Sequence, residues 1–302
     1  MRVLIIGHLV LDEIHTREGG VIESFGGIHF PVTAFSALAT EDDTVVPVFP
    51  VGEDTWDPFQ AAAARMPRLD VSRCTRVSAP NTRVRLFHDA DASYNTQLVR
   101  SLDSISYASV APELAAADLV YINFMTGADL ALDDAERLRS DARGMIYLDA
   151  HMIAYRVAPD GHRSTAPVDA WRRWIAIPDV LQCNERELAA LVPGADGERA
   201  AAEALFSMAA LRMLVVTKGG QGAVVHARDS APLRIDAAPV EAIVDTTGCG
   251  DVFGSTFAYF LARGETAANA GARAAAAGAF VASIPGSHGM EGLGRAVRGG
   301  GA

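Results

Sequence analysis

The sequence contains only three cysteines, and their spacing excludes several classes of protein. Cys74, Cys183 and Cys249 are odd in number and far apart, and no Cys-x-x-Cys pair occurs. Zinc sites, dithiol redox motifs and disulfide frameworks all need closely spaced or paired cysteines. We therefore expect a protein of a reducing compartment, with the cytoplasm as its location.

Long apolar runs and clusters of basic residues are also missing. No run reaches the roughly 18 apolar residues of a membrane-spanning helix. The opening segment Met1–Gly7 has the length of a buried strand and lacks a signal-peptide cleavage region. The net charge is −11, and no Lys/Arg-rich run occurs. These features exclude membrane and nucleic acid as partners. A nucleotide is not excluded, because helix N-termini, Mg²⁺ and one or two basic side chains can bind phosphate locally.

Three common catalytic signatures are absent as well. The chain has no Gly-x-Gly-x-x-Gly, no Gly-x-x-x-x-Gly-Lys-Ser/Thr and no Gly-x-Ser-x-Gly. A dinucleotide-dependent dehydrogenase, a P-loop ATPase and an α/β-hydrolase are therefore not supported.

The apolar residues that are present predict an α/β fold. A chain of 302 residues, 50% of them hydrophobic, can form one buried core with an appendage. Continuously apolar runs alternate with alanine-rich helical stretches, which predicts a mostly parallel sheet covered by helices on both faces. The predicted strands are Val3–Ile6, Val45–Val51, Leu119–Ile122, Met145–Leu148, Val180–Gln182, Met213–Val216 and Ala223–Val225. Ligands bind at the carboxyl ends of such strands. We expect these polar residues to gather there: Asp12, Asn123, Asp149, Asn184 and Thr217.

Two shorter, more polar stretches predict a small antiparallel sheet with one solvated face. They are Glu13–Phe25 and the segment from Thr82 to Val99. We therefore divide the chain into a main domain (1–12, 27–80 and 101–302) and a discontinuous lid (13–26 and 81–100). The glycine-rich tail from Glu291 to Ala302 is expected to fray.

The most informative segment is Asp245-Thr-Thr-Gly-Cys-Gly-Asp251, which leads into an apolar helix. The backbone N–H groups of Gly248, Cys249 and Gly250 would lie at the helix N-terminus, where anionic oxygens bind. Asp251 would accept the proton of an attacking hydroxyl beside the transferring phosphate. The alternative for a lone Gly-x-Gly-Asp is a simple helix cap.

The segment resembles the Asp-Thr-x-Gly-x-Gly-Asp signature of the ribokinase-like, or PfkB, carbohydrate kinases. Other pieces of the family pattern follow in order along most of the chain. They are Gly7 to Asp12, the pair Gly26-Gly27, Asn184-Glu-Arg-Glu187 as Asn-x-x-Glu, and Thr217-Lys-Gly-Gly-Gln-Gly222 as the nucleotide loop. The resemblance implies a three-layer α/β/α sandwich with a mostly parallel central sheet and a small β lid, which often forms a homodimer contact.

The resemblance also implies an ATP-dependent kinase of a small sugar, sugar acid or polyol. Asp251 is the implied base, and the amides of residues 248–250 stabilise charge. The implied acceptor site is formed by Asp12, Gly26, Gly27, Asn123 and His151. The implied nucleotide site is formed by Asn184, Glu187, Thr217, Gly219 and Gly222, with Mg²⁺ held by Glu187 through water. Asp245 and Thr247 are implied to bind a monovalent cation, K⁺, although both would equally suit a capped turn.

Two departures from the family pattern concern the acceptor. Many sugar kinases have an asparagine four residues after the second glycine, where this chain has Pro31. The frequent Asp-x-Asn of a central strand is here Asp149-Ala-His151. Other side chains that could face the site are His29, Arg83, Arg85, Asn95 and Gln97. A nucleoside kinase is an alternative if Phe30, Phe87 or Phe124 stacks a base, and a non-catalytic sugar or nucleotide sensor is another.

Overall fold

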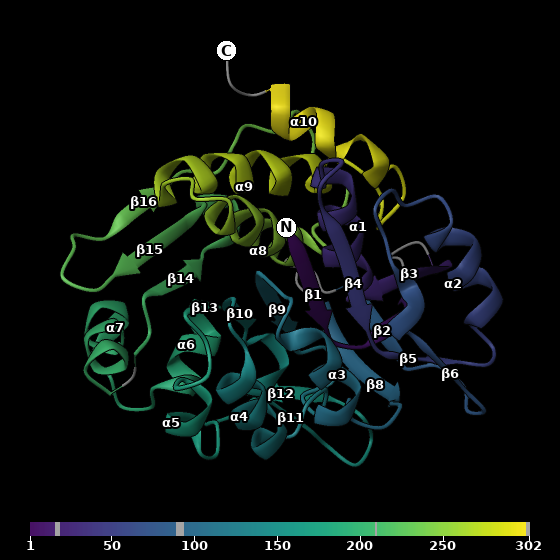
Figure 1. Ribbon diagram of the computed structural model, residues 1–302, viewed down its shortest axis with the longest axis horizontal. Coiled ribbons are helices and arrows are strands. Elements are labelled where there is room, and N and C mark those ends of the chain that lie inside the picture. Colours follow the sequence, from purple (N-terminus) through teal and green to yellow (C-terminus); the bar gives the residue numbers. More distant parts are fainter. Residues whose placement is uncertain (16–18, 89–93, 209, 300–302) are drawn as a thin grey trace.

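A computed structural model describes residues 1–15, 19–88, 94–208 and 210–299. Its centre is an eight-stranded sheet in the order β16-β15-β14-β13-β10-β9-β1-β4 (Figure 1). Every neighbouring pair is parallel except β14–β15 and β15–β16, which are antiparallel. The strands are β1 (Arg2–Ile6), β4 (Thr44–Val48), β9 (Leu119–Asn123), β10 (Met145–Asp149), β13 (Val180–Asn184), β14 (Met213–Thr217), β15 (Ala223–Ala227) and β16 (Leu233–Ile235).

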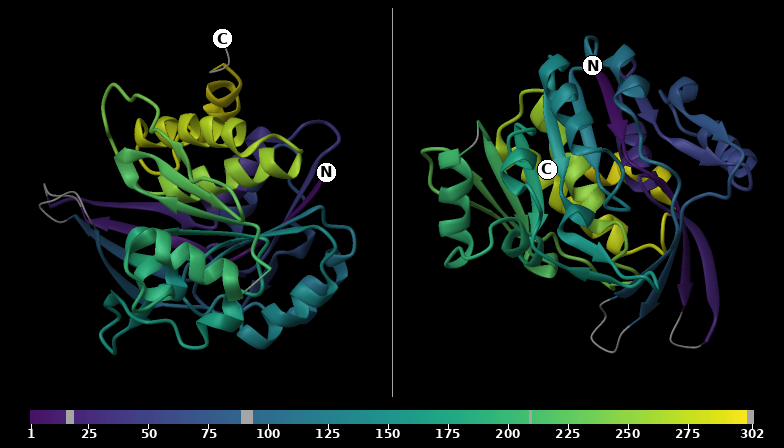
Figure 2. Two further views of the ribbon diagram at one scale, coloured as in Figure 1. Left: turned by 90° about the vertical axis from the view of Figure 1, so that its left-hand side faces the viewer. Right: turned by 90° about the horizontal axis from the view of Figure 1, so that it is seen from below.

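Helices cover both faces of this sheet, which confirms the predicted sandwich (Figures 1 and 2). One face packs against α1 (His29–Leu38), α8 (Cys249–Ala262) and α9 (Ala267–Ala282), and α10 (Leu293–Gly299) packs on α9 and α1. The other helices are α2 (Trp56–Ala63), α3 (Tyr107–Leu114), α4 (Leu132–Asp141), α5 (Trp171–Trp174), α6 (Glu185–Leu191) and α7 (Gly197–Met208), with short 3₁₀ turns at Val71–Arg73, His151–Ala154, Gly219–Gln221 and Met290–Gly292. Strands β1 and β9 are buried almost throughout, as their continuous apolar runs predict.

A separate four-stranded sheet lies beside this core, in the order β3-β2-β7-β8. Its strands are β2 (Leu9–His15), β3 (Val21–Gly27), β7 (Arg83–His88) and β8 (Tyr94–Arg100). Buried and partly buried residues alternate along β2, which agrees with one more solvated face. β2 begins at Leu9, inside the range assigned to the main domain. Asp12 therefore lies in the small sheet and not at the edge of the central one.

The outer face of the small sheet carries an ion-pair cluster. Arg83 contacts Glu13 and Glu23, and Arg85 contacts Glu13 at 2.9 Å. Val84 and Leu86 alternate with these arginines and are buried on the other face. The expectation that Arg83 and Arg85 face the site is therefore wrong, because strand alternation directs them away from it.

The apolar run Val45–Val51 forms two strands and not the single one predicted. β4 ends at Val48, and β5 (Pro50–Gly52) leaves the central sheet to pair with β6 (Thr75–Val77). Proline cannot donate a ladder hydrogen bond, so Pro50 is a suitable first residue for the new strand.

The tail does not fray where expected, because residues 293–299 form α10. Leu293 and Val297 are buried. Their spacing of four places both side chains on one helix face, which contributes to the core beside α9. Residues 300–302 lie outside the described residues.

A hairpin absent from the sequence predictions crosses between the two sheets. It consists of β11 (Tyr155–Val157) and β12 (Arg163–Thr165), joined by a turn that contains Asp160 and Gly161. The Leu98 amide on β8 donates to the Gly161 carbonyl at 2.8 Å, and the Gln97 side chain donates to the Asp160 carbonyl. The hairpin therefore connects the small sheet to the core.

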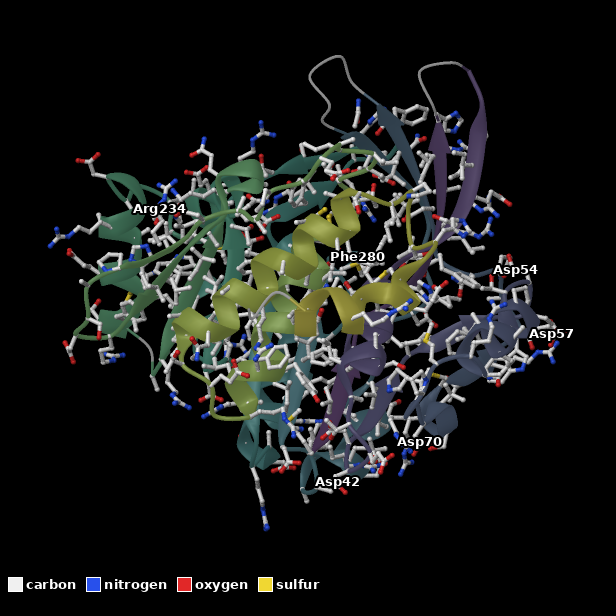
Figure 3. All side chains as sticks on the ribbon, turned by 90° about the horizontal axis from the view of Figure 1, so that it is seen from above. Asp42, Asp54, Asp57, Asp70, Arg234 and Phe280 are labelled. Carbon is white, nitrogen blue, oxygen red and sulfur yellow. The ribbon has the colours of Figure 1, made fainter. Side chains whose placement is uncertain are left out.

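Acidic side chains such as Asp42, Asp54 and Asp57 point outward at the edges of the molecule (Figure 3). Part of the net negative charge of the protein therefore lies on exposed side chains. Over the described ranges, no helix has the length and apolar character needed to span a membrane.

Candidate active site

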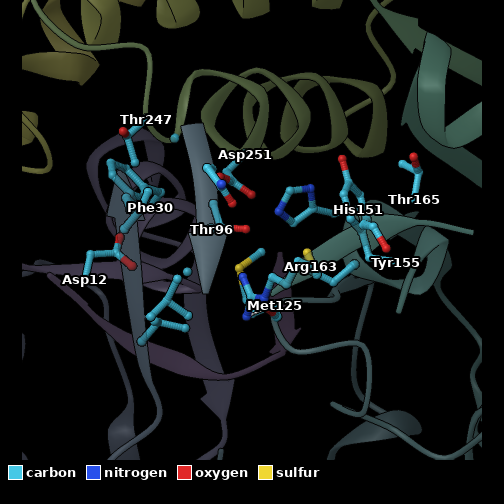
Figure 4. Close-up of a pocket in the computed structure, with 18 of the residues that line it drawn as sticks. Asp12, Phe30, Thr96, Met125, His151, Tyr155, Arg163, Thr165, Thr247 and Asp251 are labelled. Atoms are coloured by element: carbon cyan, nitrogen blue, oxygen red, sulfur yellow. Dashed lines mark hydrogen bonds between the residues drawn. The ribbon is translucent and has the colours of Figure 1, made fainter. Parts of the chain in front are cut away.

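A pocket of about 550 Å³ lies between the central sheet and the small sheet. Its lining includes Asp12 and Leu86 from the small sheet, and Asp251 from α8. His151 and Arg163 contribute from the segments that follow β10 (Figure 4). Residues from the predicted main domain and from the predicted lid thus line one cavity.

The glycine turn places Asp251 at the mouth of α8. Gly248 precedes the helix with φ of 77°, a left-handed conformation that favours glycine. A Cβ at this position would also lie 2.4 Å from the Phe30 ring. Both constraints explain the glycine, and they orient the first turn of α8 so that Asp251 lines the pocket.

The amides of the turn are not equivalent. The Cys249 amide donates to the Thr246 carbonyl at 3.3 Å. Across the described residues, the amides of Gly248 and Gly250 have no such acceptor. The predicted set of three donors is thereby reduced to two amides available to an anion, both near the positive end of the α8 dipole. The Cys249 thiol is held near the Gly278 carbonyl, and burial raises its pKa to about 12.

Asp251 lines the pocket and is hydrogen-bonded to a buried polar cluster behind it. Asn123 Nδ2 donates to Asp251 Oδ1 at 2.6 Å. Gln182 Nε2 lies 2.8 Å from Asp149 Oδ2 and 3.0 Å from the Gly250 carbonyl. Burial raises the pKa of Asp251, against the effects of His151 and of the Asn123 hydrogen bond. Burial, followed by the nearby Asp251 charge, raises the pKa of Asp149 further. Asp251 lines the pocket and Asp149 does not, so Asp251 is the better placed of the two carboxylates to act as a base.

His151 takes the position where the family frequently has an amide. Its φ is 25°, and its side chain is 43% exposed in the pocket. His151 Nδ1 lies 3.3 Å from Glu187 Oε1. Partial desolvation by the pocket walls opposes protonation, but this hydrogen bond and the surrounding carboxylates raise the pKa of His151 to about 9. An imidazolium at this point supplies positive charge next to Asp251.

Asn184 and Glu187 form a capping box at the start of α6. The Glu187 amide donates to Asn184 Oδ1 at 2.9 Å, and the Asn184 amide donates to Glu187 Oε2 at 2.8 Å. Glu187 is 2% exposed, so it is not an ordinary surface charge. One of its oxygens remains directed at His151. Both carboxylate oxygens of Glu187 are thus hydrogen-bonded within the protein, so a Mg²⁺ contact through water would use a remaining lone pair. No cluster of three or more acidic, His or Cys ligands is found within the described parts of the chain.

Asp12, Gly26 and Gly27 occupy the small-sheet side of the pocket. A Cβ at Gly26 would lie 1.7 Å from Asp12 Oδ2, so a side chain there would displace the carboxylate. Gly27 lines the pocket, with φ of 59°. Burial raises the pKa of Asp12 to about 7; the Arg163 charge opposes this shift, while Asp251 and Asp245 add to it.

Asp245 and Thr247 form the start of the turn. Asp245 accepts hydrogen bonds from the Thr247 and Gly286 amides, each at 2.9 Å, which is the capped-turn arrangement. The Thr247 hydroxyl oxygen is buried, with no hydrogen-bond partner among the residues described. An unpaired buried oxygen beside a carboxylate is compatible with a monovalent cation ligand.

The predicted nucleotide loop lies at the end of β14, beside β13. Thr217 is paired with Asn184 in the sheet register, so both lie at the same edge. Gly219 and Gly222 flank a short turn between β14 and β15. A Cβ at Gly222 would lie 2.0 Å from the Ile235 carbonyl. Close packing alone therefore requires glycine at this position, whether or not the loop binds a nucleotide. None of these loop residues lines the pocket described above.

Several other side chains differ from expectation. His29 is 8% exposed, does not line the pocket, and packs against Phe25. Phe124 is fully buried against Trp174, and Phe87 stacks on His15. Only Phe30 of the three candidate stacking residues lines the pocket. Asn95 does so as well, whereas Gln97 is used in the hairpin contact.

Sequence reasoning missed Tyr155, Arg163 and Arg186, all of which line the pocket. The first two come from the β11–β12 hairpin. Its Asp160-Gly161 pair is a recognised hairpin signal between two short segments, and it could have indicated the turn. Nothing in the sequence pattern indicates that the hairpin would reach the small sheet.

Comparison with known proteins identifies a family and a fold for this chain. The model of the pfkB family carbohydrate kinases matches residues 31–291. A search of curated proteins gave no match.

Solved structures with the same fold include three kinds of kinase. A pyrophosphate-dependent kinase in the ribokinase family, in a sulfate complex, has a TM-score of 0.79 at 18% identity, covering 97% of this chain and 99% of that one. A Burkholderia thailandensis nucleoside kinase in complex with inosine has a TM-score of 0.78 at 17% identity, with coverages of 98% and 96%. Arabidopsis thaliana ribokinase complexed with ribose and ATP has a TM-score of 0.71 at 15% identity, with 98% of each chain covered.

Proposed function

The chain belongs to the pfkB family of carbohydrate kinases, and we propose that it transfers the γ-phosphoryl group of ATP to a hydroxyl of a small sugar, sugar acid or polyol. One observation carries the proposal. The Asp251 carboxylate lines the pocket at the first turn of α8, next to two amides that have no backbone acceptor among the described residues. A base and an anion-binding turn at one point are the parts that phosphoryl transfer needs.

In the proposed reaction, Asp251 accepts the proton of the acceptor hydroxyl as its oxygen attacks the γ-phosphorus. The new P–O bond forms as the bond between the γ-phosphorus and the β,γ-bridging oxygen breaks, and ADP leaves. The amides of Gly248 and Gly250 stabilise the charge on the transferring group. The Asn123 hydrogen bond holds the Asp251 carboxylate in position and favours its ionised form.

Asp12 is the proposed ligand of the acceptor hydroxyls. A carboxylate accepts two hydrogen bonds from neighbouring hydroxyls and offers no donor in its ionised form. Its position on the small sheet, opposite Asp251 across the same cavity, supports an acceptor site between the two sheets. We also propose that residues 13–26 and 81–100 act as a lid and that the protein is cytoplasmic. A homodimer through the lid is a further expectation.

The donor is proposed to bind at the carboxyl edge formed by Asn184, Thr217 and the 219–222 turn. Bound Mg²⁺ would neutralise phosphate charge there, held by Glu187 through water. A K⁺ ion at Asp245 and Thr247 would support the turn. Pyrophosphate is a second candidate donor, because the pyrophosphate-dependent kinase noted above has the same fold over nearly the whole chain.

Nucleoside phosphorylation is the main alternative, favoured by the fold of the inosine-bound kinase. The pocket supports it less, because only Phe30 of the three candidate stacking residues lines it, and Phe124 and Phe87 pack elsewhere. A non-catalytic sensor would not need a base beside the anion turn.

The test is product formation across a panel of pentoses, hexoses, sugar acids, inositols and nucleosides. Each acceptor is offered with Mg²⁺-ATP or with Mg²⁺-pyrophosphate, with and without K⁺, and the phosphorylated product is detected by mass spectrometry. We expect one acceptor class to be phosphorylated from ATP. Binding of acceptors and donors without any product would favour the sensor.

A further inference from the structure

Arg163 brings a positive charge into the pocket without an ionic partner in the structure. Its Nη2 donates to the Met125 carbonyl at 3.1 Å. Its Nε is buried and has no hydrogen-bond partner, and the described residues supply no carboxylate within 4.0 Å of the guanidinium. Figure 4 shows the side chain reaching into the cavity beside Met125. A buried charged donor without a partner is destabilising, so its presence calls for an explanation.

The fold fixes this arginine in place. Arg163 is paired with Val157 in the β11–β12 register. The preceding Gly161 has φ of 85°, and a Cβ there would lie 2.3 Å from the Leu98 carbonyl. Gly161 thus allows the close approach of the hairpin to β8. The hairpin backbone is held from both sides, which places the Cα of Arg163 beside the pocket, and the bond from Nη2 to the Met125 carbonyl directs the side chain inward.

The nearby acidic groups do not neutralise the arginine by contact. Asp129 is the acceptor of hydrogen bonds from the His8 ring and from the Met125, Thr126 and Gly127 amides. Asp12 acts on Arg163 only through space, across the pocket. An arginine remains charged when buried, so the site keeps a fixed positive charge.

The surroundings of Arg163 suit an oxyanion. Arg186 at the start of α6 lines the same pocket, and no ion pair of Arg186 occurs among the described residues. Ser164 and Tyr155 add hydroxyl donors. We propose that the acceptor carries an anionic group, a carboxylate or a phosphate, and that Arg163 binds this group while Asp12 binds hydroxyls. This inference rests on the proposed function and narrows its acceptor. A guanidinium matches both oxyanions, because its planar N–H groups can donate to two oxygens at once.

Direct binding tests the inference without depending on turnover. Calorimetry compares D-ribonate, D-gluconate and D-glucose 6-phosphate with their neutral counterparts ribitol, D-glucitol and D-glucose. We expect one anionic compound to bind and its neutral counterpart to bind at least 10-fold more weakly. Arg163→Met should weaken the anion 10- to 100-fold, the range for a hydrogen bond to a charged group. Arg163→Lys should retain part of the affinity. Binding of ribonate or gluconate would identify a carboxylate as the anionic group of the acceptor, and binding of glucose 6-phosphate would identify a phosphate.

Arg156→Met is the matched control. Arg156 lies on the same hairpin, is 61% exposed and pairs with Asp169 at 2.8 Å. The Arg156→Met substitution should leave anion binding unchanged. Thermal melts verify that all variants are folded. Equal binding of neutral and anionic compounds, or no anion bound, would overturn the inference. So would a loss of ATP or pyrophosphate affinity in Arg163→Met without a change in acceptor affinity.

Measurements of phosphorylation rate distinguish failure of this inference from failure of the proposed function. A neutral acceptor phosphorylated at the same rate by Arg163→Met would leave the kinase proposal standing and overturn the anionic acceptor. Arg163-dependent anion binding without any phosphorylated product would support the anion site and contradict the kinase.

Discussion

The side-chain amide of Asn123, the last residue of β9, donates a 2.6 Å hydrogen bond to the carboxylate of Asp251 in the first turn of α8. It joins the centre of the sheet to the helix that carries the proposed base. Asn123 is fully buried, so its amide cannot exchange this carboxylate for bulk water. The proposed base is therefore held in one orientation before any substrate binds.

Removal of this hydrogen bond should slow the chemical step. We expect Asn123→Ala to lower kcat 10- to 100-fold with little change in KM, because a hydrogen bond to a charged group contributes about 1.5–3 kcal/mol. Steady-state kinetics with the acceptor found in the panel measure this. Ser255→Ala is the matched control, since Ser255 donates to the backbone carbonyl of Asp251 and not to its carboxylate. Equal losses in both variants would contradict a specific role for Asn123.

The two glycines of the turn should respond differently to alanine. Gly248→Ala should reduce the free energy of unfolding by about 1–3 kcal/mol and abolish most activity, because Gly248 has a left-handed φ and faces the Phe30 ring. Gly250→Ala should fold at least as stably as the wild type, since no neighbouring atom lies within 4 Å of its Cβ position. Urea unfolding measures both. Equal stabilities for the two variants would be inconsistent with this account of the turn.

The buried Asp12 should make stability depend on pH. Its folded pKa of about 7 exceeds the ordinary value of 3.8, so ionisation in the folded state costs stability as pH rises between these values. Asp12→Asn removes this cost. We expect the variant to exceed the wild type by up to about 4 kcal/mol above pH 7, with the difference disappearing toward pH 4.

Urea titrations from pH 4 to pH 8 test this expectation. The charged groups that act on Asp12 are Arg163, Asp251 and Asp245. Arg163 opposes the shift, and Arg163→Met should therefore steepen the fall in wild-type stability. A difference between Asp12→Asn and the wild type that does not change with pH would contradict the raised pKa.

The thiols should be unreactive in the folded protein. Burial raises the pKa of Cys74 and Cys183, and it raises the pKa of Cys249 to about 12. We expect no reaction with Ellman's reagent within minutes at pH 8, and reaction of all three thiols in guanidinium chloride. Rapid labelling that disappears in Cys249→Ala would indicate a reactive cysteine in the turn.

Much of the fold could be predicted because its strands are short, continuously apolar runs. The runs at Val3, Leu119, Met145, Val180 and Met213 each became a strand of the central sheet. The run at Val45 did not remain one strand, because pairing with β6 is a tertiary contact that the local pattern does not encode. The helix that contains Leu293 and Val297 was also not predicted. It is stabilised by burial of these two side chains, whereas the glycines around them indicate a frayed tail.

Parts of the candidate site could be predicted from the sequence where the backbone conformation requires a particular residue type or where a strand ends. The glycine turn needs Gly248, and the edge residues Asn123 and Asn184 follow from strand ends. Arg163 was not predictable, because its place in the pocket depends on the contact between Gly161 and Leu98, which are distant in sequence. The direction of each lid side chain also depends on register, which distinguishes Leu86 in the pocket from Phe87 outside it.

The most direct test of the central claim compares Asp251→Asn with the wild type under saturating donor and acceptor. The account predicts that kcat falls at least 100-fold, by analogy with the loss of other aimed catalytic groups, while calorimetry gives unchanged affinities for both substrates. Turnover of Asp251→Asn at the wild-type rate would contradict the assignment of Asp251 as the base.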